Sequence, residues 1–303
     1  MSEILSLYEC CALCPRECRV NRTEGAIGAC RAGAVPRVAH SMLHRWEEPC
    51  LSGENGSGTV FFSGCPLGCV YCQNHEISRG YLGEPHDSAA LAELFLSLEA
   101  RGAHNINLVT ATHHLPHIAE AIAAAKHRGL RVPIVYNTSG YESAESLHRL
   151  HGLVDIYLTD MRYASPKTAA KYSFAADYPM VSCVALRTMV DMVGAPVLDE
   201  QGMMQSGVIV RLLLLPGRLI EAKKILKEVY TAYGDGVYIS LMSQYTPPAR
   251  IGEKYPALAR TVSPYEYASL VSYARSLGVT NAFVQEGSAA SESFIPDFLG
   301  KKE

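Results

Sequence analysis

Three cysteines stand close together, directly after a short apolar run. Cys65, Cys69 and Cys72 follow the order C-x3-C-x2-C, and the Val-Phe-Phe run at 60–62 is typical of a buried strand. Thiolates at this spacing on one loop can face a common point, and iron–sulfur clusters are held by cysteine thiolates, usually four of them. Because no fourth cysteine follows nearby, the spacing predicts a 4Fe–4S cluster with one iron left open for another ligand.

Zinc is the alternative metal for this loop. His75 follows Cys72 after two intervening residues and could complete a Cys3His set, which suits zinc. Zinc fingers of that type usually space their ligands more widely, and their ligands do not follow a strand of a barrel. The iron–sulfur cluster is therefore the favoured interpretation, on ligand number, spacing and context.

A second group of cysteines lies nearer the N-terminus. Cys11, Cys14 and Cys18 form the pattern C-x2-C-x3-C, and Cys30 follows after eleven residues. Four thiolates are enough to close a tetrahedral site, and thiolate-only ligation suits zinc and iron–sulfur clusters equally. We therefore expect residues 1–57 to form a cysteine-rich extension with a second metal site, zinc or iron–sulfur. The alternative is a set of buried cysteines that bind no metal.

Composition argues against several classes of protein. The chain has 303 residues, of which 48% are hydrophobic, and a net charge of −3, so we expect no nucleic-acid or anionic-membrane partner. No stretch approaches the roughly 18–20 apolar residues of a membrane span, and the first residues do not resemble a signal peptide. Nine of the ten cysteines fall before residue 73, at ligand spacings. We therefore expect a cytoplasmic protein whose cysteines bind metal instead of forming disulfides.

From residue 58 onward the hydrophobic pattern alternates between strands and helices. The expected strands are at 60–63, 105–110, 132–137, 154–159, 208–215 and 237–242. The expected helices are at 88–101, 115–128, 142–150, 165–173, about 179–193, 218–233 and 264–277. This rhythm indicates an α/β fold with a parallel sheet wound in one sense. Six units are too few for an eight-fold barrel, so residues 58–303 are predicted to form a partial (β/α)6 parallel barrel with a C-terminal closing segment.

Polar side chains recur where the expected strands end. Ligands bind at the carboxyl ends of strands in parallel α/β folds. The polar residues at those ends, or within the fifth strand, include Thr110, Thr112, Asn137, Ser139, Asp160 and Arg211. Polar groups at one end of an otherwise apolar barrel are what a polar cofactor and substrate require. The sequence therefore predicts a site that joins these residues to the cysteine loop.

Several single residues carry weaker signals. Ser88 is the expected N-cap of its helix. His113 and His117 lie one helical turn apart but lack the H-E-x-x-H pattern, so we interpret them as surface histidines or as a helix N-terminal site that contacts substrate. Cys183 is interpreted as a small buried apolar residue of a helix.

The cysteine loop, with Tyr71 before its last cysteine, resembles the radical S-adenosylmethionine (SAM) superfamily. Further stretches are similar to uncharacterised relatives of pyruvate formate-lyase activating enzyme. These stretches are Val-Asn-Arg at 20–22, His-Arg-Trp-Glu-Glu-Pro-Cys at 44–50, Gly-Ser-Gly-Thr-Val-Phe-Phe-Ser-Gly-Cys at 56–65 and Leu-Met-Ser-Gln-Tyr at 241–245. The resemblance covers nearly the whole chain, and it implies a partial barrel of radical SAM type.

The resemblance also implies roles for individual residues. Cys65, Cys69 and Cys72 would hold the 4Fe–4S cluster, and the open iron would bind the amino and carboxylate groups of SAM. The residues expected to bind SAM are Tyr71, Asn74, Thr110, Thr112, Asn137, Ser139, Asp160 and Arg211. The chain departs from the usual Gly-Gly-Glu after the second strand, where it has Thr-Ala-Thr-His at 110–113. No catalytic acid or base is implied, since a carbon radical needs none.

The implied function is reductive cleavage of SAM to methionine and a 5′-deoxyadenosyl radical, which abstracts a hydrogen atom from a substrate. A reductant such as flavodoxin or ferredoxin is the expected partner. In one version, the protein installs a radical on a glycyl radical enzyme, which is then its protein substrate. In the other, it modifies a small molecule or another target. A different class of function stays open, in which the protein is a non-catalytic zinc or Fe–S scaffold or electron carrier.

Overall fold

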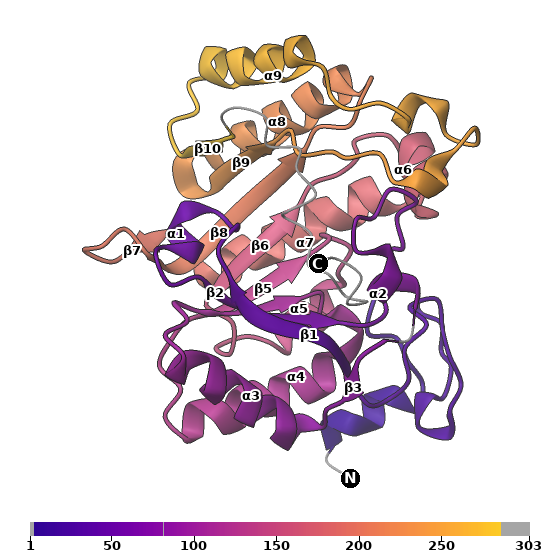
Figure 1. Ribbon diagram of the computed structural model, residues 1–303, viewed down its shortest axis with the longest axis vertical. Helices are drawn as coiled ribbons and strands as arrows, with labels where there is room; N and C mark the ends of the chain where they lie inside the picture. Colours follow the sequence, from indigo (N-terminus) through magenta and orange to yellow (C-terminus); the bar gives the residue numbers. More distant parts are fainter. Residues whose placement is uncertain (1–2, 81, 286–303) are drawn as a thin grey trace.

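A mostly parallel sheet forms the centre of the molecule. The computed structural model describes residues 3–80 and 82–285. Its strands are β1 (Arg37–His44), β2 (Ser57–Phe62), β3 (Glu84–Pro85), β4 (Ile106–Val109), β5 (Ile134–Thr138), β6 (Ile156–Asp160), β7 (Val197–Leu198), β8 (Met204–Leu213), β9 (Tyr238–Met242) and β10 (Ala282–Val284). The strand order is β10-β9-β8-β6-β5-β4-β2-β1-β3, with β7 paired to β8 (Figure 1). All pairings from β2 to β10 along this order are parallel, whereas β1, β3 and β7 pair in antiparallel fashion.

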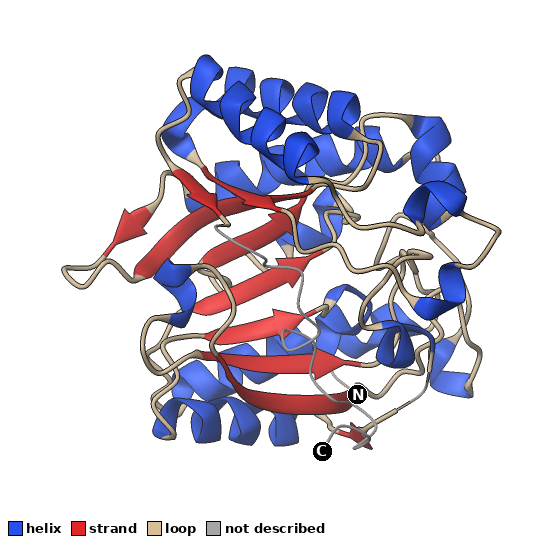
Figure 2. Ribbon diagram, turned by 45° about the horizontal axis from the view of Figure 1, so that its top comes forward, coloured by secondary structure: helices blue, strands red, loops and turns tan. Residues whose placement is uncertain are grey.

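Helices follow the parallel strands and cover the sheet. They are α1 (Pro49–Ser52), α2 (His75–Arg79), α3 (Ser88–Ala100), α4 (Leu115–His127), α5 (Ala144–His148), α6 (Pro166–Ser173), α7 (Tyr178–Val193), α8 (Leu219–Tyr233) and α9 (Pro264–Leu277). Figure 2 shows the strands side by side in one curved layer that helices cover. The helix α3 packs against α4, α5 against α7, and α8 against α9. The fold is α/β and is consistent with a partial barrel.

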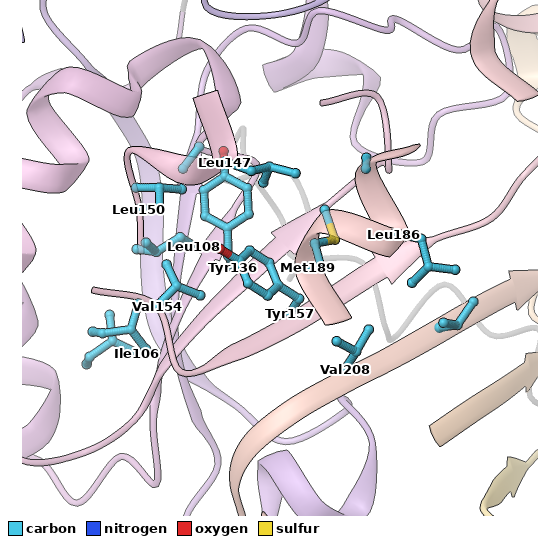
Figure 3. Close-up of a cluster of buried hydrophobic side chains, with 14 of the residues drawn as sticks. Ile106, Leu108, Tyr136, Leu147, Leu150, Val154, Tyr157, Leu186, Met189 and Val208 are labelled. Carbon is cyan, nitrogen blue, oxygen red and sulfur yellow. The ribbon is translucent and has the colours of Figure 1, made fainter. Parts of the chain in front are cut away.

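Apolar residues on the sheet meet apolar residues on the helices. Strand β5 is buried at every position, as expected for a parallel strand that is covered on both faces. Figure 3 shows this core, in which sheet residues pack against α5, α7 and the turn after α5. The labelled residues are Ile106, Leu108, Tyr136, Leu147, Leu150, Val154, Tyr157, Leu186, Met189 and Val208. Truncating one such side chain to alanine typically costs about 2–5 kcal/mol, so this layer fixes the strands whose ends carry the polar residues.

Helix starts follow from local sequence. Proline stands in the first turn of α4, α6, α7 and α9, where its missing N–H has no intrahelical partner to lose. Ser263 and Glu266 form a capping box at the start of α9. No helix in the described part of the chain combines the length and apolarity needed to cross a membrane.

The expected strands and helices from residue 58 onward are all present. The six expected strands correspond to β2, β4, β5, β6, β8 and β9. Strand β1 was not predicted, and it pairs with β2, so part of the expected extension belongs to the central sheet. The short strand β10 continues the parallel order, whereas the part of the expected C-terminal closing segment that comes after residue 285 lies outside the described residues. The domain boundary at 57 stays a prediction.

Three single-residue predictions were wrong. The N-cap of α3 is Asp87, whose carboxylate accepts from Ala90 N at 2.8 Å, while Ser88 Oγ instead donates to Glu120 at 2.7 Å. Cys183 is exposed because it lies on the outer face of α7. The surface interpretation of His113 and His117 was wrong, since both side chains are buried and the Nε2 of His113 is hydrogen bonded to Ser63 O at 2.8 Å; the alternative of a helix N-terminal site that contacts substrate stays a prediction.

Candidate functional site

A cavity of about 550 Å³ lies at the carboxyl ends of the parallel strands. Most of the predicted site residues line it together. These are Cys65, Cys69, Tyr71, Cys72, Asn74, Thr110, Asn137, Ser139, Asp160 and Arg211. Thr112 is not among the lining residues, since it is fully buried and its hydroxyl donates to Glu142 Oε1 at 2.5 Å. The fold thus brings together residues that are far apart in the sequence.

The cysteine loop follows β2 and is held by backbone contacts. Gly68 has a φ of +63°, a left-handed conformation that favours glycine, and the guanidinium of Arg79 occupies the space that a side chain would need. Val70 N donates to Tyr172 O at 2.8 Å. Cys65 N donates to Cys30 O at 3.0 Å, which joins the loop to the N-terminal segment.

The sulfur of Cys69 accepts two hydrogen bonds. Ser173 Oγ donates to it at 2.9 Å and Arg162 Nη1 at 3.1 Å. Ser173 Oγ is also 2.6 Å from the hydroxyl of Tyr163, which shares a 2.8 Å hydrogen bond with the hydroxyl of Tyr71. This chain of contacts fixes the tyrosine that the sequence places beside the last loop cysteine.

The donor set of the loop fits an iron–sulfur cluster. All three cysteines are free thiols. Burial, together with the neighbouring loop cysteines, raises the pKa of Cys65 and raises that of Cys72 to about 11, so the thiolates need a nearby positive charge that iron would supply. Within the described residues no three His, Cys, Asp or Glu side chains converge as a single metal ion requires. This result applies equally to the three loop cysteines alone and to the zinc alternative with His75, so the choice between zinc and a cluster stays a prediction.

The four N-terminal cysteines differ in burial. Cys11, Cys14 and Cys30 are buried, and Cys18 is partly buried. Cys18 Sγ accepts from Ala29 N at 3.3 Å. Among the described residues, no three or more His, Cys, Asp or Glu side chains are close enough together to hold a metal ion, and this applies to these four thiols as well. A second metal at this position stays a prediction.

A buried ionic network lines the cavity and reaches the cysteine loop through Arg162, which donates to Cys69 Sγ. Arg211 Nε lies 3.0 Å from Asp160 Oδ1, and Arg211 Nη1 lies 3.3 Å from Glu47 Oε2. Arg211 Nη2 also donates to Asn137 Oδ1 at 2.6 Å. Arg162 Nη2 lies 2.5 Å from Asp160 Oδ2. Both oxygens of Asp160 are thus paired, and one arginine links the ends of β5, β6 and β8.

The network sets the ionisation of its carboxyl groups. Burial alone would raise the pKa of Asp160, but Arg211 and Arg162 outweigh it and hold that pKa below its ordinary value. For Glu47 the balance is reversed, because burial raises its pKa by more than Arg211 lowers it. Removing a buried arginine that pairs with two acids is expected to destabilise the fold strongly, because it leaves buried carboxylates without a positively charged partner.

Two acids that were not among the predicted site residues enter the cavity from the segment between β1 and α1. Glu47 binds Arg211, and Asn107 Nδ2 donates to Glu47 Oε1 at 2.9 Å. Glu48 is 7% exposed, its Oε2 has no hydrogen-bond partner, and burial raises its pKa. The signal in the sequence was the pair of adjacent acids before Pro49. Only the structure shows that this pair of acids lines the cavity.

Glu142 provides a pH-dependent contribution to stability. Its Oε1 accepts from the hydroxyls of Thr112 and Thr138, and burial raises its pKa from 4.5 to about 7. The protonated form is therefore favoured by folding. The contribution of Glu142 to the free energy of unfolding is fully present below pH 4.5. It is lost as the pH rises from 4.5 through about 7, and the loss is on the order of 3 kcal/mol.

The substitution Glu142→Gln is expected to remove this dependence, because the amide oxygen can still accept from both threonines. Urea unfolding of both proteins between pH 5 and pH 8 measures the effect. The variant is expected to gain stability relative to the unsubstituted protein as the pH rises. Parallel stability curves across this range would show that Glu142 does not titrate near neutrality.

Ser173→Ala is expected to lower the reduction potential of a cluster on the loop. Hydrogen bonds to cluster sulfurs stabilise the reduced, more negative state. One such bond contributes about 1 kcal/mol, which corresponds to roughly 40 mV for one electron. A redox titration followed by electron paramagnetic resonance measures the shift. Ser182→Ala is the control, because the Ser182 hydroxyl donates to Pro179 O within α7; equal potentials in the two variants would exclude this role for Ser173.

Comparison with known proteins agrees with this geometry. Residues 59–174 match the family model of the Radical SAM superfamily. Proteins of this class hold an iron–sulfur cluster and cleave SAM by radical chemistry. The chain is also similar to the uncharacterized protein MJ0674 of Methanocaldococcus jannaschii, with 26% identity over 265 residues that cover 85% of this chain and 72% of the relative. The match to the domain includes β2, β4, β5 and β6, but not β8 with Arg211 or the segment with Glu47.

Proposed function

We propose that this protein is an enzyme that cleaves SAM reductively at a 4Fe–4S cluster and uses the resulting radical to abstract a hydrogen atom from a substrate. The observation that carries the proposal is the position of Cys65, Cys69 and Cys72. All three line one end of a 550 Å³ cavity at the carboxyl ends of the parallel strands, within the region that matches the Radical SAM superfamily.

Different residues of the chain are proposed to hold the cluster, to bind SAM and to position the strand ends. The three loop cysteines would hold the cluster, which supplies the electron that cleaves SAM. The residues proposed to bind SAM are Tyr71, Asn74, Thr110, Asn137, Ser139, Asp160 and Arg211, all of which line the cavity. Arg211 is already paired with Asp160 and Glu47, so its main effect is to hold the ends of three strands in place. Thr112 can act only through the backbone, because its hydroxyl is bonded to Glu142.

The substrate separates two versions of the proposal. The similarity of the sequence to relatives of pyruvate formate-lyase activating enzyme supports a glycyl radical enzyme as the protein substrate. The second version is modification of a small molecule or another target. Transfer of deuterium from a glycine-labelled glycyl radical enzyme into 5′-deoxyadenosine would support the first version, and its absence would leave only the second.

The experiment that tests the proposal is anaerobic reconstitution with iron and sulfide. The protein is expected to become brown and, when it is reduced with dithionite, to convert SAM to methionine and 5′-deoxyadenosine. A colourless protein that holds stoichiometric zinc and does not cleave SAM would contradict the proposal. It would instead support a non-catalytic scaffold.

A second metal in the N-terminal segment is part of the proposal. Cys11, Cys14, Cys18 and Cys30 would hold zinc or an iron–sulfur cluster. These thiols are close enough to affect one another's ionisation. Burial raises the pKa of Cys30, and Cys11 and Cys18 raise it further. Metal analysis of a protein in which the loop cysteines are replaced measures this site directly, since any metal that stays bound must lie elsewhere.

A further inference from the structure

A second hollow lies on the outer side of the cysteine loop. It has a volume of about 710 Å³ and is bordered by α2, the C-terminal end of α6 and the segment around 250–255. Figure 1 shows α2 and α6 on the same side of the molecule. Cys69 lines both this hollow and the internal cavity. Cys69 therefore lies between the outer surface and the proposed cluster site.

The hollow is strongly basic in a chain that is acidic as a whole. Arg31, Arg79, Arg250 and Lys254 border it, with Glu76 as the single lining carboxylate among the described residues. The net charge of the chain is −3, so the excess of positive charge at this hollow is opposite in sign to the charge of the whole chain.

These cations are not neutralised by the surrounding side chains. Within residues 3–80 and 82–285, none of the four cations that border the hollow forms an ion pair. The arginines donate to backbone carbonyls instead, for example Arg250 Nη2 to Cys72 O at 2.6 Å and Arg79 Nη1 to Ala29 O at 3.2 Å. The pKa of His75 is lowered by partial burial and then by the guanidinium groups of Arg250, Arg79 and Arg31. The positive field is therefore available to a partner.

An apolar side chain stands at the edge of the hollow. Phe174 is 60% exposed and has a φ of +54°, a left-handed conformation that is unusual for a residue other than glycine. Arg16 holds it there, since Arg16 Nη1 donates to Phe174 O at 2.6 Å and Arg16 Nε to Pro66 O at 3.0 Å. An exposed aromatic residue surrounded by charge is typical of the centre of a protein interface.

We propose that this hollow docks an acidic one-electron carrier protein that reduces the cluster through Cys69. The inference rests on the proposed function, which requires an external electron for each SAM cleaved. In the step, the reduced cofactor of the carrier loses one electron and the cluster gains it, and no bond forms or breaks. Charge complementarity favours an acidic partner, because a basic patch steers it and raises its association rate. The position of Cys69 gives a short path from the docked surface to the cluster.

The test uses reconstituted protein and a reduced flavodoxin as the probe. The docking variant is Arg31→Glu with Lys254→Glu, because both residues are exposed and lie outside the internal cavity. The control is Lys227→Glu with Arg275→Glu, which makes the same change in net charge on the exposed faces of α8 and α9. Bleaching of the cluster absorbance in a stopped-flow instrument gives the rate of reduction without any need for SAM.

The docking variant is expected to be reduced by flavodoxin at least about tenfold more slowly at low salt, and the control within about twofold of the unsubstituted protein. The rate for the unsubstituted protein should fall as salt is added. Dithionite should reduce all three proteins equally and support equal SAM cleavage. Equal slowing of both variants, no slowing of the docking variant, or no reduction of the unsubstituted protein by flavodoxin would overturn the inference. Failure of SAM cleavage with dithionite would instead contradict the proposed function.

Discussion

A protein in which Cys65, Cys69 and Cys72 are all replaced by alanine is expected to lose the brown colour of the loop cluster and all SAM cleavage. The three thiols line the cavity, and the Cys69 sulfur already accepts two hydrogen bonds that stabilise negative charge. Iron–sulfur clusters depend on their cysteine ligands, and radical cleavage of SAM depends on the cluster. Iron and sulfide analysis, with the amount of 5′-deoxyadenosine formed, measures the effect.

The matched control is Cys10→Ala with Cys183→Ala, because both cysteines are exposed and neither lines the cavity. This variant is expected to keep its cluster and its activity. Full SAM cleavage by the protein without loop cysteines would show that the cluster is held elsewhere, and the N-terminal cysteines would then be the first candidates. Loss of activity in the control would show that the effect is not specific to the loop.

Arg211→Met is expected to lower the free energy of unfolding by about 3–5 kcal/mol, the usual cost of removing one partner from a buried ion pair. Arg211 is buried between Asp160 and Glu47. Asp160 keeps Arg162 at 2.5 Å, but Glu47 is left with only neutral partners, Asn107 and Asn137. Urea unfolding under anaerobic conditions measures the loss.

Adding Glu47→Gln to the Arg211→Met protein should restore part of the lost stability, since the unpaired carboxylate is then removed. The single variant Glu47→Gln completes a double-mutant cycle, and it keeps the hydrogen bonds that an amide can make. A change of less than about 1 kcal/mol for Arg211→Met, typical of an exposed ion pair, would contradict the network described here. Additive effects of the two substitutions would show that Arg211 and Glu47 do not interact.

The sequence predicted the parallel part of the fold because its signal is local. Strands such as β5 are short apolar runs, and helices such as α9 begin at a serine cap followed by proline and a glutamate. Strand β1 gave no such signal, because only two of its eight positions are buried. Its pairing with β2 depends on tertiary contact, which residue periodicity does not record.

The candidate site was predictable where residue type and strand position coincide. Asn137 and Asp160 lie at the carboxyl ends of β5 and β6, Ser139 directly follows β5, and all three line the cavity. Glu47 and Glu48 reach the cavity from a segment before the first parallel strand, so the rule about strand ends does not include them. Thr112 obeys the rule by position, but its side chain turns to the buried Glu142. Side-chain direction after a strand depends on packing that only the folded chain shows.

The central claim is that a cluster on the cysteine loop has an iron available to SAM. Electron paramagnetic resonance of the reduced, reconstituted protein, recorded with and without SAM, tests it most directly. The spectrum is expected to be that of a reduced 4Fe–4S cluster and to change when SAM is added, in the unsubstituted protein and in the Cys10→Ala, Cys183→Ala control. A cluster signal that SAM leaves unchanged, or no signal together with bound zinc, would contradict the claim.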